Sequence, residues 1–158
     1  MNYRMILFIL GWVLNFESVF LLLPSVTALC YGESAGWSFL LTAGFCLLTG
    51  VLITRKKPKQ KNLYSRDGFV IVSLSWIVLS LFGAVPFVLS GTIPDFIAAL
   101  FESVSGFTTT GASILTDVEA VPKCCLMWRS FTNWIGGMGV LVFIMAFLPL
   151  SGAGNMNL

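Results

Sequence analysis

The 158-residue sequence has no histidine and few charged residues. Charged side chains make up 10% of the chain and hydrophobic side chains 57%, a balance that excludes an ordinary soluble domain. Proton transfer near neutral pH and zinc ligation both draw first on imidazole, so the absence of histidine argues against either chemistry. No nucleophile–base pair or metal-ligand cluster is evident. We therefore expect a membrane protein that is not an enzyme, with no cofactor and no nucleic-acid partner.

Cysteine is also scarce and lacks the spacing of a redox motif. None of the four cysteines stands in a C-x-x-C pair. Cys46 lies inside an apolar run, where it behaves as a small hydrophobic residue. Cys124 and Cys125 are adjacent and could pair outside the membrane, but we expect free thiols in a loop.

Long apolar runs account for much of the chain. A transmembrane helix needs about 20 mostly apolar residues, and four runs reach or approach that length. The fourth gains length if Met127 and Trp128 lie in the headgroup layer, where tryptophan is favoured. The first is too long for the core of a cleaved signal peptide, so we expect it to be retained. The runs are Met5–Leu29, Trp37–Thr54, Phe69–Ser90 and Phe131–Leu148.

Basic residues gather in one short loop between the second and third runs and predict the orientation. Because cytoplasmic loops carry the excess of lysine and arginine, this loop is expected inside, together with the amino terminus. Acidic residues then lie mostly outside, where they either follow from the orientation or concentrate cations. The loop residues are Arg55, Lys56, Lys57, Lys59, Lys61 and Arg66; the outer acidic residues are Glu33, Asp95, Asp117 and Glu119.

The apolar segment between the third and fourth runs is too short to span a bilayer. Thr92 can cap a helix there, with Asp95 answering three positions later and Pro94 in the first turn. The predicted helix continues through Phe96–Ser105 and stops at Gly106. Such a helix enters from outside and ends partway through the bilayer, with its carbonyl end carrying a partial negative charge. A cation would be stabilised at that end.

The polar residues that follow are the strongest candidates for ion contact. Non-helical backbone at membrane depth must line a cavity or be buried, because unsatisfied peptide groups are costly in hydrocarbon. Thr108–Ser113 offers hydroxyl and carbonyl oxygens, and Gly111 permits conformations that turn a carbonyl toward an axis. The alternative is an ordinary exterior loop, which would leave the short capped helix unexplained.

These residues resemble a known family. The motifs are FESVSGFTTTGAS at 101–113, Trp128-Arg129-Ser130 and the WIGGMG of Trp134–Gly139. They are similar to those of the Trk-type potassium uptake proteins of the Trk/Ktr/HKT superfamily. The resemblance covers about residues 66–158, and the two preceding helices are similar to the extra amino-terminal pair of Trk-type members.

The resemblance implies an all-α, polytopic membrane protein. Residues 1–65 would form an amino-terminal helix pair with the basic loop. Residues 66–158 would form the first pore unit, made of outer helix, re-entrant pore helix, filter and inner helix. Gly111 matches the family's filter glycine, so Thr109, Thr110, Gly111 and Ala112 would bind K⁺ through backbone carbonyls, flanked by Thr108 and Ser113. Serine in place of that glycine tends towards sodium, so Gly111 leans towards potassium.

The family also implies partners and a location. Four unequal units in one polypeptide surround the ion, whereas this chain holds one. We expect further units from a longer chain, with a homotetramer of single units as the alternative. The resemblance further implies a cytosolic nucleotide-binding regulatory subunit and the bacterial inner (plasma) membrane. A non-conducting assembly or anchoring subunit is the alternative function.

Two carboxylates within apolar segments need an explanation. Glu17, with Asn15 nearby, lies midway along the first run, where an ionised carboxylate costs about 2.5–3.5 kcal/mol. It could bind a cation or proton, but we favour packing of the first helices against the pore unit. Glu102 is expected to be buried in the pore helix and to pair with Arg129, bracing the filter, although Arg129 could instead extend to the headgroups.

A stripe of small residues lies on the last run. It consists of Gly136, Gly137 and Gly139, with Asn133 beside them. Close helix packing is the commonest use of such a stripe. Bending of the inner helix, or a wider passage below the filter, is the second interpretation.

Overall fold

The computed structural model describes residues 3–55 and 65–152, with side chains from residue 67 to residue 141 in the second range. The described residues form helices and no strand, as the sequence predicts. Lys56, Lys57, Lys59 and Lys61 of the basic loop, and the side chain of Arg66, lie outside the described part. The helices are α1 (Tyr3–Phe20), α2 (Leu22–Tyr31), α3 (Gly36–Thr54), α4 (Ser65–Leu89), α5 (Phe96–Phe107) and α6 (Lys123–Gly152).

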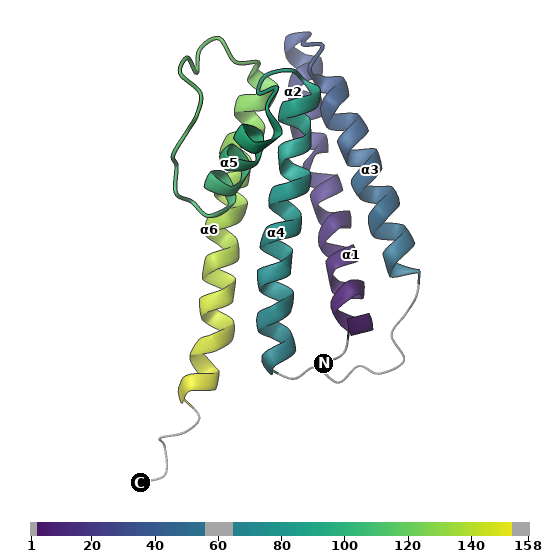
Figure 1. Ribbon diagram of the computed structural model, residues 1–158, viewed down its shortest axis with the longest axis vertical. Coiled ribbons are helices and arrows are strands. Elements are labelled where there is room, and N and C mark those ends of the chain that lie inside the picture. The colour runs from purple at the N-terminus through teal and green to yellow at the C-terminus, as the bar shows by residue number, and fades with distance from the viewer. Residues whose placement is uncertain (1–2, 56–64, 153–158) are drawn as a thin grey trace.

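Three stretches of the described residues are long and apolar enough to cross a membrane. They are Tyr3–Tyr31, Gly36–Thr54 and Asp67–Leu89. Figure 1 shows α1, α3, α4 and α6 side by side as long rods. α1 packs chiefly against α3 and also contacts α4, which joins the amino-terminal helices to the rest of the chain.

The first apolar run forms one membrane-spanning stretch, Tyr3–Tyr31, as the sequence predicts, with a break at the single residue Leu21. α1 ends at Phe20 and α2 begins at Leu22. Pro24 explains the break, because proline lacks the N–H that would reach the carbonyl of Phe20 and its ring crowds that carbonyl. Leu21 still donates its N–H to Glu17 at 2.9 Å, so the chain continues in nearly the same direction.

The short helix α5 is capped differently from the prediction. Asp95, in an extended conformation, is the N-cap residue and accepts the N–H of Ala98 at 3.0 Å. Thr92 instead bonds the hydroxyl of Ser90 and the thiol of Cys125. Helix α5 therefore starts at Phe96, after Pro94.

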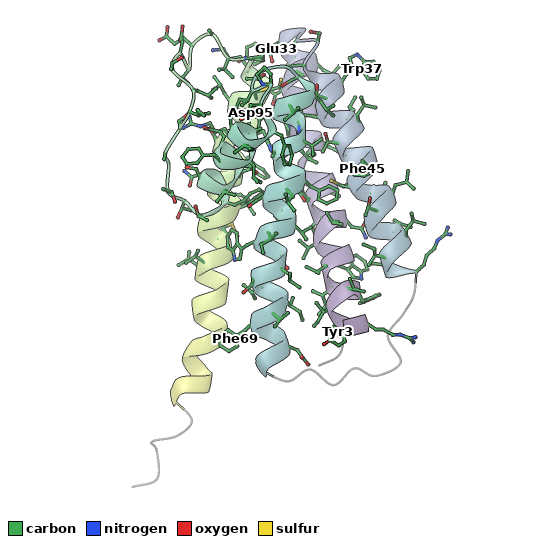
Figure 2. All side chains as sticks on the ribbon, in the orientation of Figure 1. Tyr3, Glu33, Trp37, Phe45, Phe69 and Asp95 are labelled. Carbon is green, nitrogen blue, oxygen red and sulfur yellow. The ribbon has the colours of Figure 1, made fainter. Side chains whose placement is uncertain are left out.

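The chain enters and leaves the α5 region at one end of the bundle. Figure 1 shows α5 descending from the end where α4 stops, and the following loop returning to that end, where α6 begins. α5 packs between α4 and α6. In Figure 2, Glu33 and Asp95 lie near this end, and Tyr3 and Phe69 lie toward the other. The segment from α5 to α6 thus has the re-entrant course that the sequence predicts.

Candidate ion-binding site

The backbone after α5 folds back onto the last turn of that helix. The N–H groups of Thr108–Gly111 donate to the carbonyls of Val104, Ser105 and Gly106 at 2.9–3.5 Å. Across a trans peptide bond, the N–H of one residue and the carbonyl of the residue before it point in opposite directions. The carbonyls of Thr109 and Thr110 therefore point away from α5.

The backbone dihedral angles in this segment alternate in sign. Thr109 has φ of 58° and Gly111 has φ of 75°, whereas Thr110 and Ala112 are not among the residues with positive φ. In an extended strand, where every residue has negative φ, successive peptide groups face opposite sides. A segment in which negative and positive φ alternate can instead turn successive carbonyls to one side. Thr109 is the unusual member, because a β-branched residue in the left-handed region is strained by about 1–3 kcal/mol.

Ala112, another of the predicted ligands, is held by the pore-helix candidate α5. Its carbonyl accepts the hydroxyl of Ser105 at 2.6 Å. A carbonyl oxygen has two lone pairs, so this bond orients the Ala112 carbonyl and leaves one lone pair for a cation. The sequence did not indicate Ser105 as a support residue.

Hydroxyl groups add further bonds at the start of the segment. Thr108 donates to the carbonyl of Val104 at 2.7 Å and lies 2.8 Å from the hydroxyl of Thr110. Thr109 donates to the carbonyl of Thr108 at 2.7 Å. These bonds occupy the threonine side chains and the Thr108 carbonyl. The backbone carbonyls of Thr109, Thr110 and Gly111, together with the second lone pair of the Ala112 carbonyl, are left as the candidate ion ligands.

Glu102 joins three parts of the chain beside the candidate ligands. Its buried carboxylate forms an ion pair with Nε of Arg129 on α6. It also accepts the hydroxyl of Ser113, at 3.1 Å for each oxygen, and the N–H of Ile114 at 2.9 Å. The predicted pair is therefore formed, and the carboxylate additionally anchors the chain directly after Ala112.

The inner helix candidate α6 approaches α5 closely through its small residues. A Cβ atom on Gly136 would collide with the backbone carbonyl of Phe107, and one on Gly106 would collide with the hydroxyl of Thr132. Gly137 has more room, because its nearest neighbour would be Thr109 Cγ2 at 3.9 Å. Gly136 thus serves close packing, which is the first interpretation of the glycine stripe.

Trp128 is buried among the helices, a contact that the sequence does not predict. It is fully buried, with its ring 6.4 Å from those of both Phe39 and Phe107. Its indole N–H donates to the carbonyl of Gly83 on α4 at 2.9 Å. A buried indole needs such an acceptor. Trp128 therefore ties α3, α4 and α5 to α6 behind the candidate site.

The cysteine pair is also placed differently from the prediction. Cys124 and Cys125 lie in the first turn of α6 and are buried, not in a loop. Both are free thiols, as predicted, and so are Cys30 and Cys46.

Glu33 caps the start of α6 from the loop between α2 and α3. Its carboxylate accepts the N–H of Lys123 at 2.6 Å and of Cys124 at 3.0 Å. Desolvation acts to raise the pKa of Glu33, but the backbone N–H of Cys124 and that of Lys123 outweigh it, so the pKa is lowered. This contact spans 90 residues, and no local sequence pattern indicates it.

Exposure divides the site into two sides. Glu102, Ser105, Gly106 and Phe107 are buried on the supporting side. Residues 108–114 are exposed in the isolated chain. The candidate carbonyls therefore border a face that this chain does not cover by itself.

Helices of membrane-spanning length, a re-entrant short helix and a following segment with outward-turned carbonyls define a polytopic α-helical membrane protein. The chain belongs to the TrkH family of cation transport proteins, which it matches over residues 39–158.

Several curated proteins are similar to the whole chain. The Trk system potassium uptake protein TrkH of Escherichia coli K12 is 40% identical over 163 residues, which cover 100% of this chain and 33% of that protein. TrkH of Halomonas elongata is 39% identical, covering 100% of this chain and 33% of that protein. TrkG of Escherichia coli K12 is 40% identical, covering 98% and 32%. The chain thus spans about a third of the length of these relatives.

A solved structure has the same fold. The crystal structure of the potassium transporter TrkH from Vibrio parahaemolyticus matches with a TM-score of 0.88 and 39% identity. The match covers 99% of this chain and 34% of that chain, in its amino-terminal part. The family resemblance and the all-helical membrane fold predicted from the sequence are therefore confirmed.

Proposed function

We propose that this chain contributes one of four filter segments to a potassium uptake pathway across the bacterial inner membrane. The carbonyls of Thr109, Thr110, Gly111 and Ala112 replace water around K⁺, and Thr108 and Ser113 hold the ends of the segment. The observation that carries the proposal is the hydrogen bonding of this segment's backbone. The N–H groups of Thr108–Gly111 are tied to α5, which turns the carbonyls of Thr109 and Thr110 to the opposite side.

Electrostatics supports a cation at this position. The carbonyl end of α5, which carries about half a negative charge, meets the start of the segment. Carbonyl oxygens are the ligands that replace the hydration shell of K⁺ in channel filters. The names of the relatives, potassium uptake proteins, agree with this ion. Sodium is the competing ion. Because this chain supplies one of four filter segments, the selectivity between potassium and sodium also depends on the other three.

Three further segments are needed to close a ring around the ion. We propose that they come from further pore units of a longer polypeptide, in which residues 66–158 are the first unit and residues 1–65 an appended helix pair. Four copies of a single unit are the alternative. The basic end of the bundle faces the cytoplasm in this proposal. A cytosolic nucleotide-binding regulatory subunit stays a prediction from the family.

Growth of a potassium-uptake-deficient bacterium at low potassium tests the proposal. The full-length gene should restore growth, and Gly111→Asp should abolish it, because the new side chain and the strained backbone displace the carbonyls. Gly91→Asp is a matched control, since Gly91 has φ of 72° and open space around its Cβ position but lies in the turn before α5. Equal growth with Gly111→Asp and the wild type contradicts the filter assignment and favours an anchoring subunit.

A further inference from the structure

Phe107 is the last residue of α5 and directly precedes the candidate filter. Its side chain is fully buried, whereas residues 108–114 are exposed. Successive Cα atoms are about 3.8 Å apart across a trans peptide, so a shift of Phe107 carries Thr108 with it. The contacts of Phe107 therefore decide where the exposed segment begins.

The ring of Phe107 is enclosed by aromatic and small residues of the neighbouring helices. Its centroid lies 6.4 Å from the ring of Trp76 on α4 and 6.4 Å from that of Trp128 on α6. Both pairs have the edge-to-face geometry that aromatic rings favour. Gly83 on α4 adjoins the ring as well, because an added Cβ there would lie 2.9 Å from Phe107 Cε2.

The residues around the ring are linked to each other across α4 and α6. Trp128 donates its indole N–H to the carbonyl of Gly83 at 2.9 Å. Trp76 lies against Gly139, where an added Cβ would be 3.3 Å from two atoms of the indole. The position of the ring is therefore set by two helices that are fixed to each other, and not by α5 alone.

The backbone of Phe107 is also in close contact with α6. An added Cβ on Gly136 would lie 2.2 Å from the carbonyl oxygen of Phe107 and 3.1 Å from its Cα. Toward α1, by contrast, the ring borders a cavity of about 120 Å³. The residues of α4 and α6 that make these close contacts form the Phe107 socket: Trp76, Gly83, Trp128 and Gly136.

A filter needs support at both of its ends. Ligand groups must be held within about 0.5 Å of the productive geometry by residues that packing locks in place. Glu102 supplies this support at one end of the segment, through the hydroxyl of Ser113. The Phe107 socket lies at the other end, next to Thr108.

We propose that Phe107 is a positioning residue for the filter, and that its socket sets the position of Thr108 and of the carbonyls that follow. This role rests on the proposed function, because it is defined relative to the filter carbonyls. Glu102 and Phe107 then fix the two ends of the segment through separate contacts.

The ratio of potassium to sodium uptake in proteoliposomes that contain the full-length protein tests the role of Phe107. Phe107→Leu leaves part of the socket empty and should lower the ratio severalfold. Phe39→Leu is a matched control, because Phe39 is also fully buried and its ring also lies 6.4 Å from that of Trp128, but it belongs to α3. Both variants should lower the unfolding temperature, and only Phe107→Leu should change the ratio. An unchanged ratio with Phe107→Leu, or an equal fall with Phe39→Leu, would overturn the positioning role.

A second pair of variants reaches Phe107 through its backbone. Gly136→Ala should also lower the ratio, because the new methyl group displaces the Phe107 carbonyl. Gly137→Ala should leave the ratio unchanged, because its Cβ would meet Thr109 Cγ2 only at 3.9 Å. Equal ratios for these two variants would contradict the positioning role.

Gly111→Ser in the same assay separates the positioning role from the filter proposal. A ratio that falls with Gly111→Ser but not with Phe107→Leu or Gly136→Ala would leave the filter assignment standing and overturn the role of Phe107. A ratio that none of the three variants changes would overturn both.

Discussion

Ser113 donates its hydroxyl to both carboxylate oxygens of Glu102, across eleven positions of sequence. This bond ties the end of the candidate filter to the middle of α5. Because Glu102 also pairs with Arg129 on α6, one buried carboxylate fixes the segment relative to two helices. A flexible segment could not hold carbonyls at the spacing of a dehydrated ion, so this support is a requirement of the proposed function.

Glu102→Gln should destabilise the protein and weaken its selectivity. Removing one partner of a buried ion pair costs about 3–5 kcal/mol, and the lower end applies here because the Arg129 side chain is 28% exposed. The loss appears as a lower thermal unfolding temperature of the full-length protein in detergent. The potassium-to-sodium uptake ratio should fall as well. Unchanged stability and selectivity would contradict the bracing role, and Glu119→Gln is the exposed control.

Ser105→Ala tests the bond that orients the Ala112 carbonyl. The loss of a neutral hydrogen bond costs about 1 kcal/mol, and the freed carbonyl should lower potassium affinity. Ser75→Ala is the control, because its hydroxyl bonds the carbonyl of Ile71 within the same helix at 2.7 Å. Potassium uptake at a series of concentrations measures both variants. A KM that rises equally in both would exclude a specific role for Ser105.

Gly136→Ala should be far more harmful than the neighbouring Gly137→Ala. The new methyl group of the first variant collides with the Phe107 backbone, and overpacking of this kind costs about 1–3 kcal/mol. The second variant meets only an ordinary contact with Thr109 and gains helix propensity of up to about 1 kcal/mol. Thermal unfolding and potassium uptake separate the two. Equal effects would show that α5 and α6 do not approach closely at Gly136.

The contact of Glu33 with the start of α6 predicts a pH dependence of stability. The pKa of Glu33 is lowered from its ordinary value of 4.5, so its stabilising effect is present above 4.5 and is lost as pH falls through the lower, folded value. Wild type should therefore be more stable than Glu33→Gln at neutral pH, and this difference in stability should disappear as the pH falls below 4.5. Unfolding temperatures over this range measure it. A difference that persists unchanged in acid would contradict the assignment.

The sequence predicted those features that depend on local pattern. The lengths of the apolar runs predicted the membrane-spanning helices. The short apolar segment before Thr108 predicted the re-entrant helix. The Glu102–Arg129 pair was predictable because both residues fall at one depth once the helices are counted. The N-cap was placed wrongly at Thr92, because both Thr92 and Asp95 are good caps and tertiary contacts with Ser90 and Cys125 engage Thr92.

Other features depend on contacts between distant segments. Trp128 is buried because the carbonyl of Gly83 accepts its indole N–H, and no pattern around Trp128 reveals that acceptor. Glu33 likewise meets α6 only after the helices are packed. The alternating backbone of Thr109–Ala112 was suggested only by Gly111, since threonine at positive φ is against its intrinsic preference.

The Gly111 carbonyl is proposed to belong to the ion pathway, and substitution of Gly111 by serine tests this with little added bulk. Gly111 and Gly91 have φ values of 75° and 72°, and neither has an atom within 4 Å of its Cβ position. Gly111→Ser and Gly91→Ser therefore impose similar backbone strain. The two variants differ in position, because Gly111 lies among the candidate carbonyls and Gly91 lies in the turn before α5.

The decisive measurement is the ratio of potassium to sodium uptake in proteoliposomes that contain the full-length protein. Gly111→Ser should lower the ratio by about tenfold, which corresponds to about 1.4 kcal/mol of relative free energy. Gly91→Ser should leave the ratio at the wild-type value. An unchanged ratio with Gly111→Ser, or an equal fall with both variants, would contradict the assignment of Thr109–Ala112 to the filter.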